Sequence, residues 1–393
     1  MRLSGFGRPD MEEAPLAQAH PASSSGPAAQ RIDILDWSRA FAAVAVMIFH
    51  YFFNGIVNGK LTGLPLNEGL GEVVRYGYLG VEFFFIISGY VISYSFDGKT
   101  AGQFASARAL RLLPAFWAGV LITSMVSWLW GEGVLVVSGA RLLANFTMVP
   151  QLFRQAYVDG VYWTLAYEMS FYALIGLGLL LASSSAIRAM LFLWVWVLLA
   201  ARMTGLDFIP FLGSYFCFFA AGSVFAMRSV GPVLRVPTLL VALYLCIAFS
   251  IDNASELGIT RRTVYDPVVI AALIGAMFAF FSLLDLSVVR NLRLPGARLA
   301  GGLTYPLYLV HAHIGYMTLS AFGDARHPVA STLLMMGISL LLALAVHLGV
   351  ERRYARQWKE LFSRTIGWSV DKVAGWLQRW TRILFGWRNV RRV

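Results

Sequence analysis

Long apolar runs recur along this chain, and they constrain its fold more than any other feature. Ten runs lie between residues 35 and 350 of the 393. Most approach the roughly 20 apolar residues that an α-helix needs to cross a bilayer. Their period is helical, which argues against a membrane barrel built from alternating strands. The sequence therefore predicts an all-α, polytopic membrane protein with about ten transmembrane helices.

Composition agrees with these expected spans. Charged residues form 13% of the chain, against about 25% in soluble proteins, which excludes a cytosolic enzyme, a secreted disulfide scaffold and a disordered protein. Cys217 and Cys246 lie inside apolar runs, so neither disulfides nor a metal site is expected. The fifth and seventh spans are short. The ten spans are residues 35–57, 78–96, 112–130, 163–182, 187–201, 208–227, 237–251, 268–284, 303–322 and 329–350.

The net charge of +11 is concentrated in the C-terminal tail. Residues 351–393 carry a net +8, which leaves +3 for the other 350 residues. A basic tail after membrane spans indicates attraction to anionic lipid rather than to nucleic acid. With the N-terminus inside, the inner segments hold 23 Lys and Arg and the outer loops hold eight. This asymmetry predicts that both termini are cytoplasmic.

Three regions follow from these patterns. Residues 1–30 are rich in Pro, Ser and Gly, so we expect them to be disordered, with no removable signal peptide. Residues 31–351 form the expected transmembrane domain. Residues 352–393 form a basic amphipathic tail, predicted to lie as a helix in the cytoplasmic interface, although packing against a soluble partner is an alternative. Its apolar positions are Trp368, Val373, Trp376, Leu377, Trp380, Ile383, Leu384 and Trp387, and Lys372, Arg379, Arg382 and Arg388 occupy much of the remainder.

Ionisable residues inside spans are functional candidates, because each costs about 2.5 to 3.5 kcal/mol on insertion scales. Arg39 and His50 are 11 residues apart, which places them on one helix face with a rise of about 16 Å. This face can hold an anionic group at its cytoplasmic mouth and a base further in. The alternative is that Arg39 pairs with Asp36 and that His50 is a packing histidine. The intramembrane candidates are Arg39, His50, Glu82, Glu168, His311, His313 and His347.

Arg108 and Arg111 open the third span at i,i+3 spacing and can hold phosphate from one helix face. They can equally be topology anchors. Glu168 and Glu82 lie toward the outer side, where a carboxylate needs a partner such as histidine, or else a tyrosine or a backbone group.

The ninth span carries Tyr305, Tyr308 and His311, which are spread over about 240° of a helix. His311 and His313 point to nearly opposite faces and make a poor chelate. Neither HExxH nor GxSxG nor a Gly-rich phosphate loop occurs, so metal hydrolysis and serine-hydrolase chemistry have no support.

Together these segments resemble the acyltransferase family 3 membrane proteins, which carry acyl groups onto extracytoplasmic or exported glycans. The resemblance covers residues 31–351. Trp37 replaces a usual glycine and Glu82 replaces a common Asp. The matching segments are residues 31–39 (RIDILDWSR) with His50 after ten residues, 80–90 (GVEFFFIISGY), 108–114 (RALRLLP), 163–172 (WTLAYEMSFY) and 305–311 (YPLYLVH).

The resemblance implies a two-ended enzyme of a bacterial inner membrane, with acyl-CoA as co-substrate and no tightly bound cofactor. The CoA phosphates would lie near Arg39, Arg108 and Arg111, and a glycan hydroxyl would approach from outside. His50 would be the general base or an acyl carrier. Glu168 or Glu82 would orient its imidazole. His311 would be a second base or an oxyanion donor.

Two other functional classes remain open at this point. A transporter or flippase of a lipid-linked glycan or small acid would use the same buried charges and consume no acyl-CoA. A sensor or scaffold would depend on the tail and not on His50. The acyl group and the acceptor glycan are not specified by the sequence.

Overall fold

The computed structural model describes residues 31–385, without the side chains of Gln378 and residues 381–385. Its secondary structure over this range is entirely helical. The expected disorder of residues 1–30 concerns a segment outside the described residues. The longer helices are α1 (Asp33–Phe49), α4 (Gly80–Ser95), α5 (Ala101–Trp130), α7 (Trp163–Leu181), α8 (Ser184–Thr204), α9 (Phe216–Ala226), α10 (Pro232–Arg261), α11 (Pro267–Leu283), α13 (Ala297–Val310), α14 (Ala312–Phe322), α15 (Pro328–Val346) and α17 (Trp368–Phe385). The short helices are α2 (Gly55–Val57), α3 (Glu68–Val74), α6 (Gly139–Asn145), α12 (Ser287–Arg290) and α16 (Ala355–Phe362).

Seven helical segments are long and apolar enough to cross a membrane. Two further apolar helices, α9 and α11, are shorter. Helix occurs in every expected span, but the count of ten spans and the side of each terminus stay predictions. The seven segments are Asp33–Val57, Glu68–Ser95, Ala101–Trp130, Gly160–Leu181, Ser184–Thr204, Pro232–Arg261 and Pro328–Arg352.

Three spans differ in length from the sequence expectation. The fifth and seventh, expected to be short, are helices of 21 and 30 residues. The sixth was expected to begin at residue 208, but its helix begins at Phe216 and has 11 residues. Pro210 and the positive φ angles of Phe211 (70°) and Ser214 (52°) keep the preceding segment out of the α-helical conformation.

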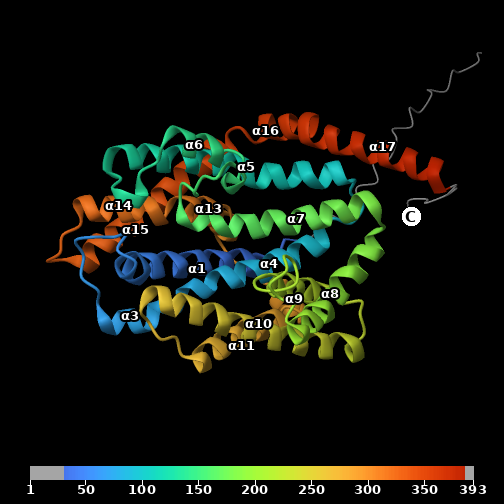
Figure 1. Cartoon of the computed structure of the whole chain (residues 1–393), viewed down its shortest axis with the longest axis horizontal. Coiled ribbons are helices and arrows are strands. Elements are labelled where there is room, and N and C mark those ends of the chain that lie inside the picture. Colours follow the sequence, from blue (N-terminus) through green and yellow to red (C-terminus); the bar gives the residue numbers. More distant parts are fainter. Residues whose placement is uncertain (1–30, 386–393) are drawn as a thin grey trace, which may run out of the picture. The chain divides into compact units, whose positions relative to one another are not determined.

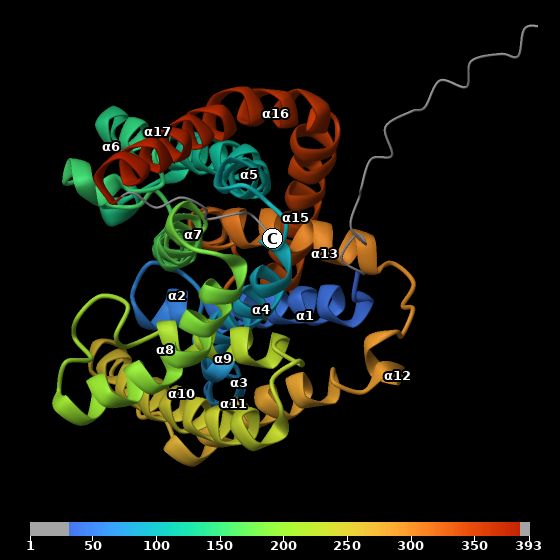
Figure 2. The ribbon, with the colours of Figure 1, turned by 90° about the vertical axis from the view of Figure 1, so that its right-hand side faces the viewer.

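Helix α1 lies at the centre of the bundle and packs against α4 and α13 (Figures 1 and 2). Glycines let several neighbours approach closely. A Cβ on Gly89 of α4 would lie 2.1 Å from the carbonyl oxygen of Phe219, and one on Gly222 of α9 would lie 2.0 Å from that of Ile86. Small residues at such contacts allow the backbone-to-backbone packing that is common between membrane helices.

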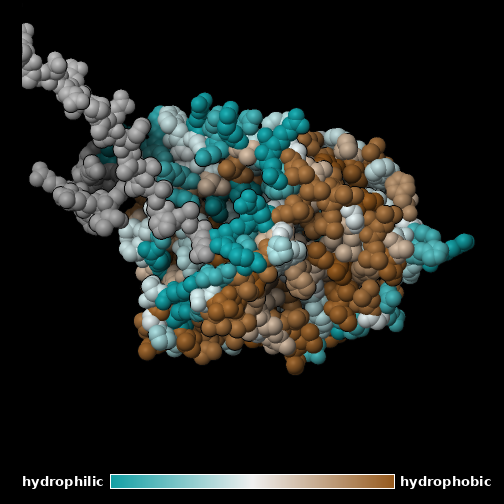
Figure 3. Space-filling view, turned by 180° about the vertical axis from the view of Figure 1, so that it is seen from behind, coloured by the Kyte–Doolittle hydropathy of each residue, from teal (hydrophilic) through white to brown (hydrophobic). Residues whose placement is uncertain are grey.

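One face of the bundle is largely apolar. Figure 3 shows one face on which hydrophobic side chains cover a continuous area and hydrophilic ones gather toward one end. Exposed leucines on α15 contribute such surface, with Leu334 69% and Leu341 67% exposed. A lipid environment removes the cost of this exposure, which water would impose.

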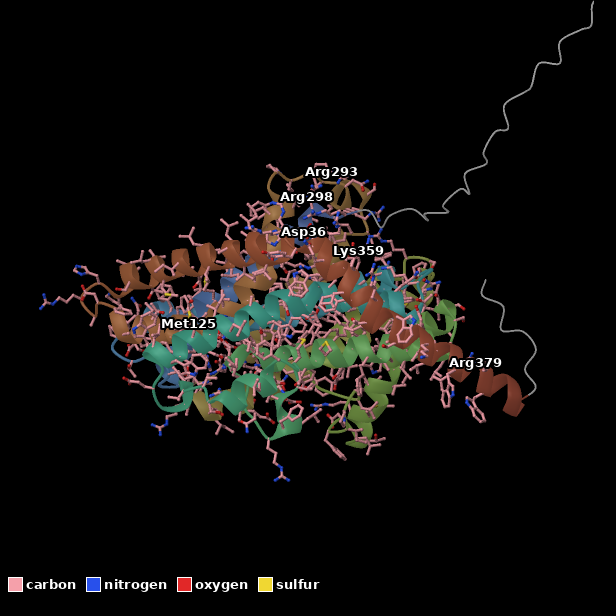
Figure 4. The ribbon with its side chains drawn as sticks, turned by 90° about the horizontal axis from the view of Figure 1, so that it is seen from above. Asp36, Met125, Arg293, Arg298, Lys359 and Arg379 are labelled. Atoms are coloured by element: carbon pink, nitrogen blue, oxygen red, sulfur yellow. The ribbon has the colours of Figure 1, made fainter. Side chains whose placement is uncertain are left out.

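The C-terminal helices α16 and α17 lie across α5 on the outside of the bundle (Figures 1, 2 and 4). Trp358 and Phe362 of α16 contact Trp117 of α5, with ring centroids 6.0 and 6.1 Å away. Asp371 of α17 accepts hydrogen bonds from Thr100 Oγ1 and from the backbone N–H of Gly102, both at 3.0 Å. The tail therefore caps the start of α5.

The prediction that the tail forms a helix is confirmed for Trp368–Phe385. Its position at a lipid interface stays a prediction. The side chains of Arg382, Ile383 and Leu384, and residues Trp387 and Arg388, lie outside the described part. Figure 4 shows Arg379 near the end of this helix and Lys359 on α16.

Candidate active site

A cavity of about 300 Å³ brings together the charged residues that the sequence singled out on three different helices. Arg39 comes from α1, Arg108 and Arg111 from α5, and Glu168 from α7. The remaining walls are mostly aromatic or apolar, with one serine and two threonines among them. They are formed by Val81, Phe84, Phe85, Ser88, Val91, Ile92, Thr164, Leu165, Tyr172, Thr304, Tyr305 and Tyr308.

The two α5 arginines have aromatic rings as neighbours and, within the described residues, no acidic partner. Arg108 lies 5.6 Å from the ring centroids of both Phe104 and Tyr172, and its Nε is buried without a hydrogen bond. Arg111 lies 5.5 Å from the ring of Tyr305. Such cation–π contacts position a guanidinium without neutralising it, so its charge remains available to an anionic ligand.

Arg39 has an acidic neighbour and also borders the cavity. Its Nη1 lies 3.6 Å from Asp36 Oδ1, which is the expected i,i+3 pair, yet its side chain also lines the cavity. Asp36 is shared, because Arg31 Nε lies 2.6 Å from its other oxygen. The ion pair with Asp36 therefore leaves part of the Arg39 charge facing the cavity.

Glu168 contacts a tyrosine and a serine rather than a histidine. Its Oε1 accepts hydrogen bonds from the Tyr172 hydroxyl and, at 3.3 Å, from Ser88 Oγ. Both partners also line the cavity. Glu168 therefore provides negative charge beside the arginines. Of the partners that the sequence left open for this carboxylate, the structure shows a tyrosine, Tyr172.

Glu82 lies outside the cavity. It is 1% exposed, and neither carboxylate oxygen has a hydrogen-bond partner among the described residues. Cys246 and Ser250 of α10 are its neighbours. The expectation that Glu168 or Glu82 contacts the His50 imidazole is not met in this structure, because His50 has other partners.

His50 is held by residues that the sequence did not single out. Its Nδ1 forms a hydrogen bond with the Tyr316 hydroxyl and lies 3.3 Å from Asn54 Nδ2. Asn54 Nδ2 also donates to the Tyr316 hydroxyl at 3.0 Å. His50 begins a π-helical segment, His50–Asn54, that interrupts the regular α-helix, and such segments are frequent at functional sites.

His311 faces His50, with ring centroids 5.0 Å apart. Its Nδ1 lies 2.9 Å from the carbonyl oxygen of Tyr308 and 3.2 Å from that of Leu307. Because a carbonyl only accepts, Nδ1 carries the proton of the neutral ring. Nε2 then presents a lone pair, and it is buried without a hydrogen-bond partner in the described structure.

The helix is interrupted at His311, between the end of α13 and the start of α14. In a continuous helix, the Leu309 carbonyl would accept a hydrogen bond from the N–H of His313. Here that carbonyl accepts from the Tyr162 hydroxyl at 3.0 Å. The N–H of His313 donates to Asp159 Oδ2 at 2.8 Å. Side chains have thus replaced a backbone hydrogen bond, which is a recognised cause of helix kinks.

Tyr308 connects the cavity with the histidine pair. Its ring lines the cavity and lies 5.7 Å from the His311 ring. Its hydroxyl is 2.8 Å from Thr164 Oγ1. The arginine-rich cavity and the two histidines are therefore neighbouring parts of one site.

The other candidate histidines have structural partners. His313 Nδ1 lies 3.1 Å from the carbonyl oxygen of Val158, and its Nε2 accepts from the N–H of Gly160 at 3.1 Å. His347 Nδ1 lies 2.6 Å from Glu351 Oε2.

Lys60 lies in the connection after α2. Burial lowers the pKa of its ammonium group, and the nearby Asp159 opposes that shift.

A family model described as "Acyltransferase domain" matches residues 32–348. The chain belongs to this acyltransferase family. The match includes the cavity-lining arginines, Glu168 and both facing histidines, and it ends before residues 352–393. The arginine-rich cavity and the two facing histidines thus lie wholly within the matched range.

Two curated relatives of this acyltransferase come from rhizobia. "Exopolysaccharide production protein ExoZ" of Rhizobium meliloti (strain 1021) is 26% identical over 308 residues, covering 74% of this chain and 93% of that protein. "Nodulation protein 10" of Rhizobium leguminosarum bv. viciae is 27% identical over 330 residues, covering 74% of this chain and 85% of that protein. No solved structure matches the acyltransferase.

Proposed function

We propose that this acyltransferase moves an acyl group from cytoplasmic acyl-CoA to a hydroxyl of an exported or extracytoplasmic glycan. Acetyl is the group to test first. The enzyme would lie in a bacterial inner membrane with both termini cytoplasmic. One relative is named an exopolysaccharide production protein, which supports a glycan as the acceptor.

The observation that carries this proposal is the pairing of an arginine-rich cavity with two facing histidines. Arg39, Arg108 and Arg111 would bind the CoA phosphates, for which the planar guanidinium is well suited. The thioester would extend past Tyr308 toward His50 and His311, whose rings are 5.0 Å apart. Donor binding and chemistry would then occupy adjacent parts of the site.

His50 would act in one of two ways. As general base, it takes the proton of the acceptor hydroxyl while that oxygen attacks the thioester carbonyl, and CoA leaves as its thiolate. As acyl carrier, its nitrogen attacks first, CoA leaves, and the hydroxyl then attacks the acyl-imidazole. In both routes the product is an ester and the thiolate of CoA takes up a proton.

His311 would be the second histidine of the reaction. The proton on its Nδ1 points toward two backbone carbonyls, which leaves Nε2 as an acceptor. This arrangement favours a role as a second base over a role as hydrogen-bond donor to the oxyanion. Glu168 would balance the charge of the arginines when no donor is bound.

Mass spectrometry of surface glycans tests the proposal. Cells that carry the intact gene, no gene, or the His50→Ala variant would be compared for one acyl mass. We expect that mass to be present only with the intact gene, and the purified enzyme to release CoA in proportion to the ester formed. Movement of a glycan or acid without release of CoA would overturn the proposal in favour of a transporter.

A further inference from the structure

The hydrogen bonds of His50 end at two neutral side chains. Tyr316 and Asn54 occupy its Nδ1, and no hydrogen bond or ion pair joins a carboxylate to the ring among the described residues. His50 itself is partly exposed, whereas Tyr316 is 1% and Asn54 is 6% exposed. The two partners are therefore enclosed, and Nε2 is the nitrogen left for reacting groups.

We propose that Tyr316 and Asn54 are the positioning residues of His50, and that the Asn54 amide selects which ring nitrogen carries the proton. This inference rests on the proposed function, in which His50 acts as base or acyl carrier. It replaces the carboxylate that usually orients a catalytic histidine with a neutral hydroxyl–amide pair. Neither residue lies in a segment that carried the sequence resemblance.

The backbone places these two side chains closely. Asn54 is four residues after His50 in the π-helical segment, and Tyr316 comes from α14 on the other side of the site. The next residue is Gly55, where a Cβ would lie 2.4 Å from Tyr316 Cε1. A side chain there would push the tyrosine ring away from His50, so the glycine makes room for this contact.

The proton positions follow from what each group can donate. As placed, Asn54 Nδ2 donates to the Tyr316 hydroxyl and lies within donating distance of His50 Nδ1. The tyrosine proton then points to Nδ1, so the neutral ring carries its proton on Nε2. In this arrangement His50 is a hydrogen-bond donor and not a base.

The opposite orientation of the Asn54 amide gives a second arrangement of these hydrogen bonds. The amide Oδ1 is buried without a hydrogen-bond partner in the described structure, so either orientation of the amide leaves one of its two ends unpaired. A half turn of the amide brings Oδ1 to the Tyr316 hydroxyl, which then donates to Oδ1 and accepts from Nδ1–H. His50 Nε2 now has a free lone pair and can take a proton or attack the thioester.

Two variants of each partner test this assignment in the purified full-length enzyme with acetyl-CoA. Tyr316→Phe keeps the ring and its packing but removes the hydroxyl. We expect kcat to fall about 10- to 100-fold, by analogy with the loss found when the hydrogen-bond partners of metal-binding residues are removed. KM for acetyl-CoA should change less than about threefold, because the arginine cavity is untouched. Tyr316→Leu, which also loses the ring, should fall further and lose stability.

Asn54 separates hydrogen bonding from packing. Asn54→Leu has a similar size and no polar atoms, and we expect a loss of kcat like that of Tyr316→Phe. Asn54→Asp retains an oxygen for the tyrosine hydroxyl, and we expect it to keep at least about one fifth of wild-type kcat. Rescue by Asp and not by Leu would show that the carbonyl acceptor is what His50 requires.

Tyr76→Phe is the matched control, since Tyr76 is a buried tyrosine whose hydroxyl accepts from the backbone N–H of Asp266 at 2.9 Å and which does not line the cavity. Its kcat should stay within about threefold of wild type. Equal kcat in Tyr316→Phe and Tyr76→Phe, or equal kcat in Asn54→Leu and Asn54→Asp, would overturn the positioning assignment. A wild-type enzyme that forms no acyl ester would instead overturn the proposed function, and the two failures are therefore distinguishable.

Discussion

The arginine-rich cavity and the histidine pair are neighbours, yet they are built in opposite ways. The cavity presents three cations and one carboxylate, with rings of Tyr305, Phe104 and Tyr172 beside the α5 arginines. The histidine pair is held by neutral groups, through a hydroxyl, an amide and backbone carbonyls. The first part is suited to hold an anion, and the second to move a proton.

The difference teaches that a charged site and a proton-transfer site need different supports. An arginine keeps its charge in almost any surroundings, so aromatic contacts suffice to place it. A histidine must present the correct nitrogen, which depends on a defined donor or acceptor at the other nitrogen. Substitutions in the two parts should accordingly change different kinetic constants.

The largest effect is expected at His50. His50→Ala should lower kcat by about 10²- to 10⁴-fold, the range for loss of a general acid–base group, with normal abundance in the membrane. His327→Ala is a suitable control, because that histidine is 72% exposed at its side chain and lies on a connection. Near-normal ester formation by His50→Ala would remove it from the reaction.

Arg39→Ala should also abolish measurable acylation, through loss of donor binding rather than of proton transfer. Arg39 is the cavity arginine on the same helix as His50, so its loss tests whether the two parts act on one donor. Arg31→Ala removes the other partner of Asp36 but does not touch the cavity. If Arg39→Ala and Arg31→Ala bind and transfer equally well, the donor route past Arg39 is wrong.

Arg108→Lys and Arg111→Lys should each raise KM for acyl-CoA by about tenfold, because a point charge cannot replace the planar fork of donors. The acceptor KM and kcat should change little. Arg188→Lys, in an exposed pair with Asp97, serves as the control. A rise confined to the acceptor KM would place these arginines at the glycan instead.

Glu168→Gln should lower the rate by several-fold and by more than Glu168→Asp. Gln can still accept from Tyr172 and Ser88 but has no charge to balance the arginines, whereas Asp keeps the charge. Initial rates at saturating donor would measure the difference. Equal losses would indicate a positional role, and no loss in either variant would transfer the carboxylate role to Glu82.

The smallest effect on chemistry is expected from the tail. Trp368, Val373, Trp376 and Trp380 of α17 are each about half exposed, while Asp371 binds the start of α5. A peptide of residues 365–393 should be unstructured in water and become helical with anionic vesicles, more weakly as salt rises. Circular dichroism with anionic and neutral vesicles would measure this. Helix formation that ignores lipid charge would contradict the prediction.

The same prediction can be tested in the enzyme itself with a truncated chain that ends at residue 364. We expect it to be less stable in the membrane, with kcat close to wild type in the protein that remains, since no residue of the cavity or histidine pair lies in α17. A stably inserted but inactive truncation would show that the contact of Asp371 with α5 is required for catalysis.

Much of this acyltransferase could be read from its sequence, because hydrophobic length and intramembrane charge are local properties. Helices in every expected span, the proximity of Arg39, Arg108 and Arg111, and the family were predicted, whereas Glu168 was expected beside His50 and instead lines the arginine-rich cavity. Charges in an apolar run stand out by residue type alone. The lengths of the fifth, sixth and seventh spans were wrong, since a helix extends beyond its apolar stretch or stops where backbone angles forbid it.

Partners of the histidines could not be read in this way. Tyr316 is 266 residues from His50, and Asn54 and Tyr316 are ordinary residues for an apolar helix and its end. At the helix break beside His311, hydrogen bonds from Tyr162 and to Asp159 take the place of a backbone hydrogen bond, and both residues lie in the connection before α7. Neutral hydrogen bonds have no signature in a sequence, because a hydroxyl or an amide becomes a partner only when packing of distant helices brings it within about 3 Å.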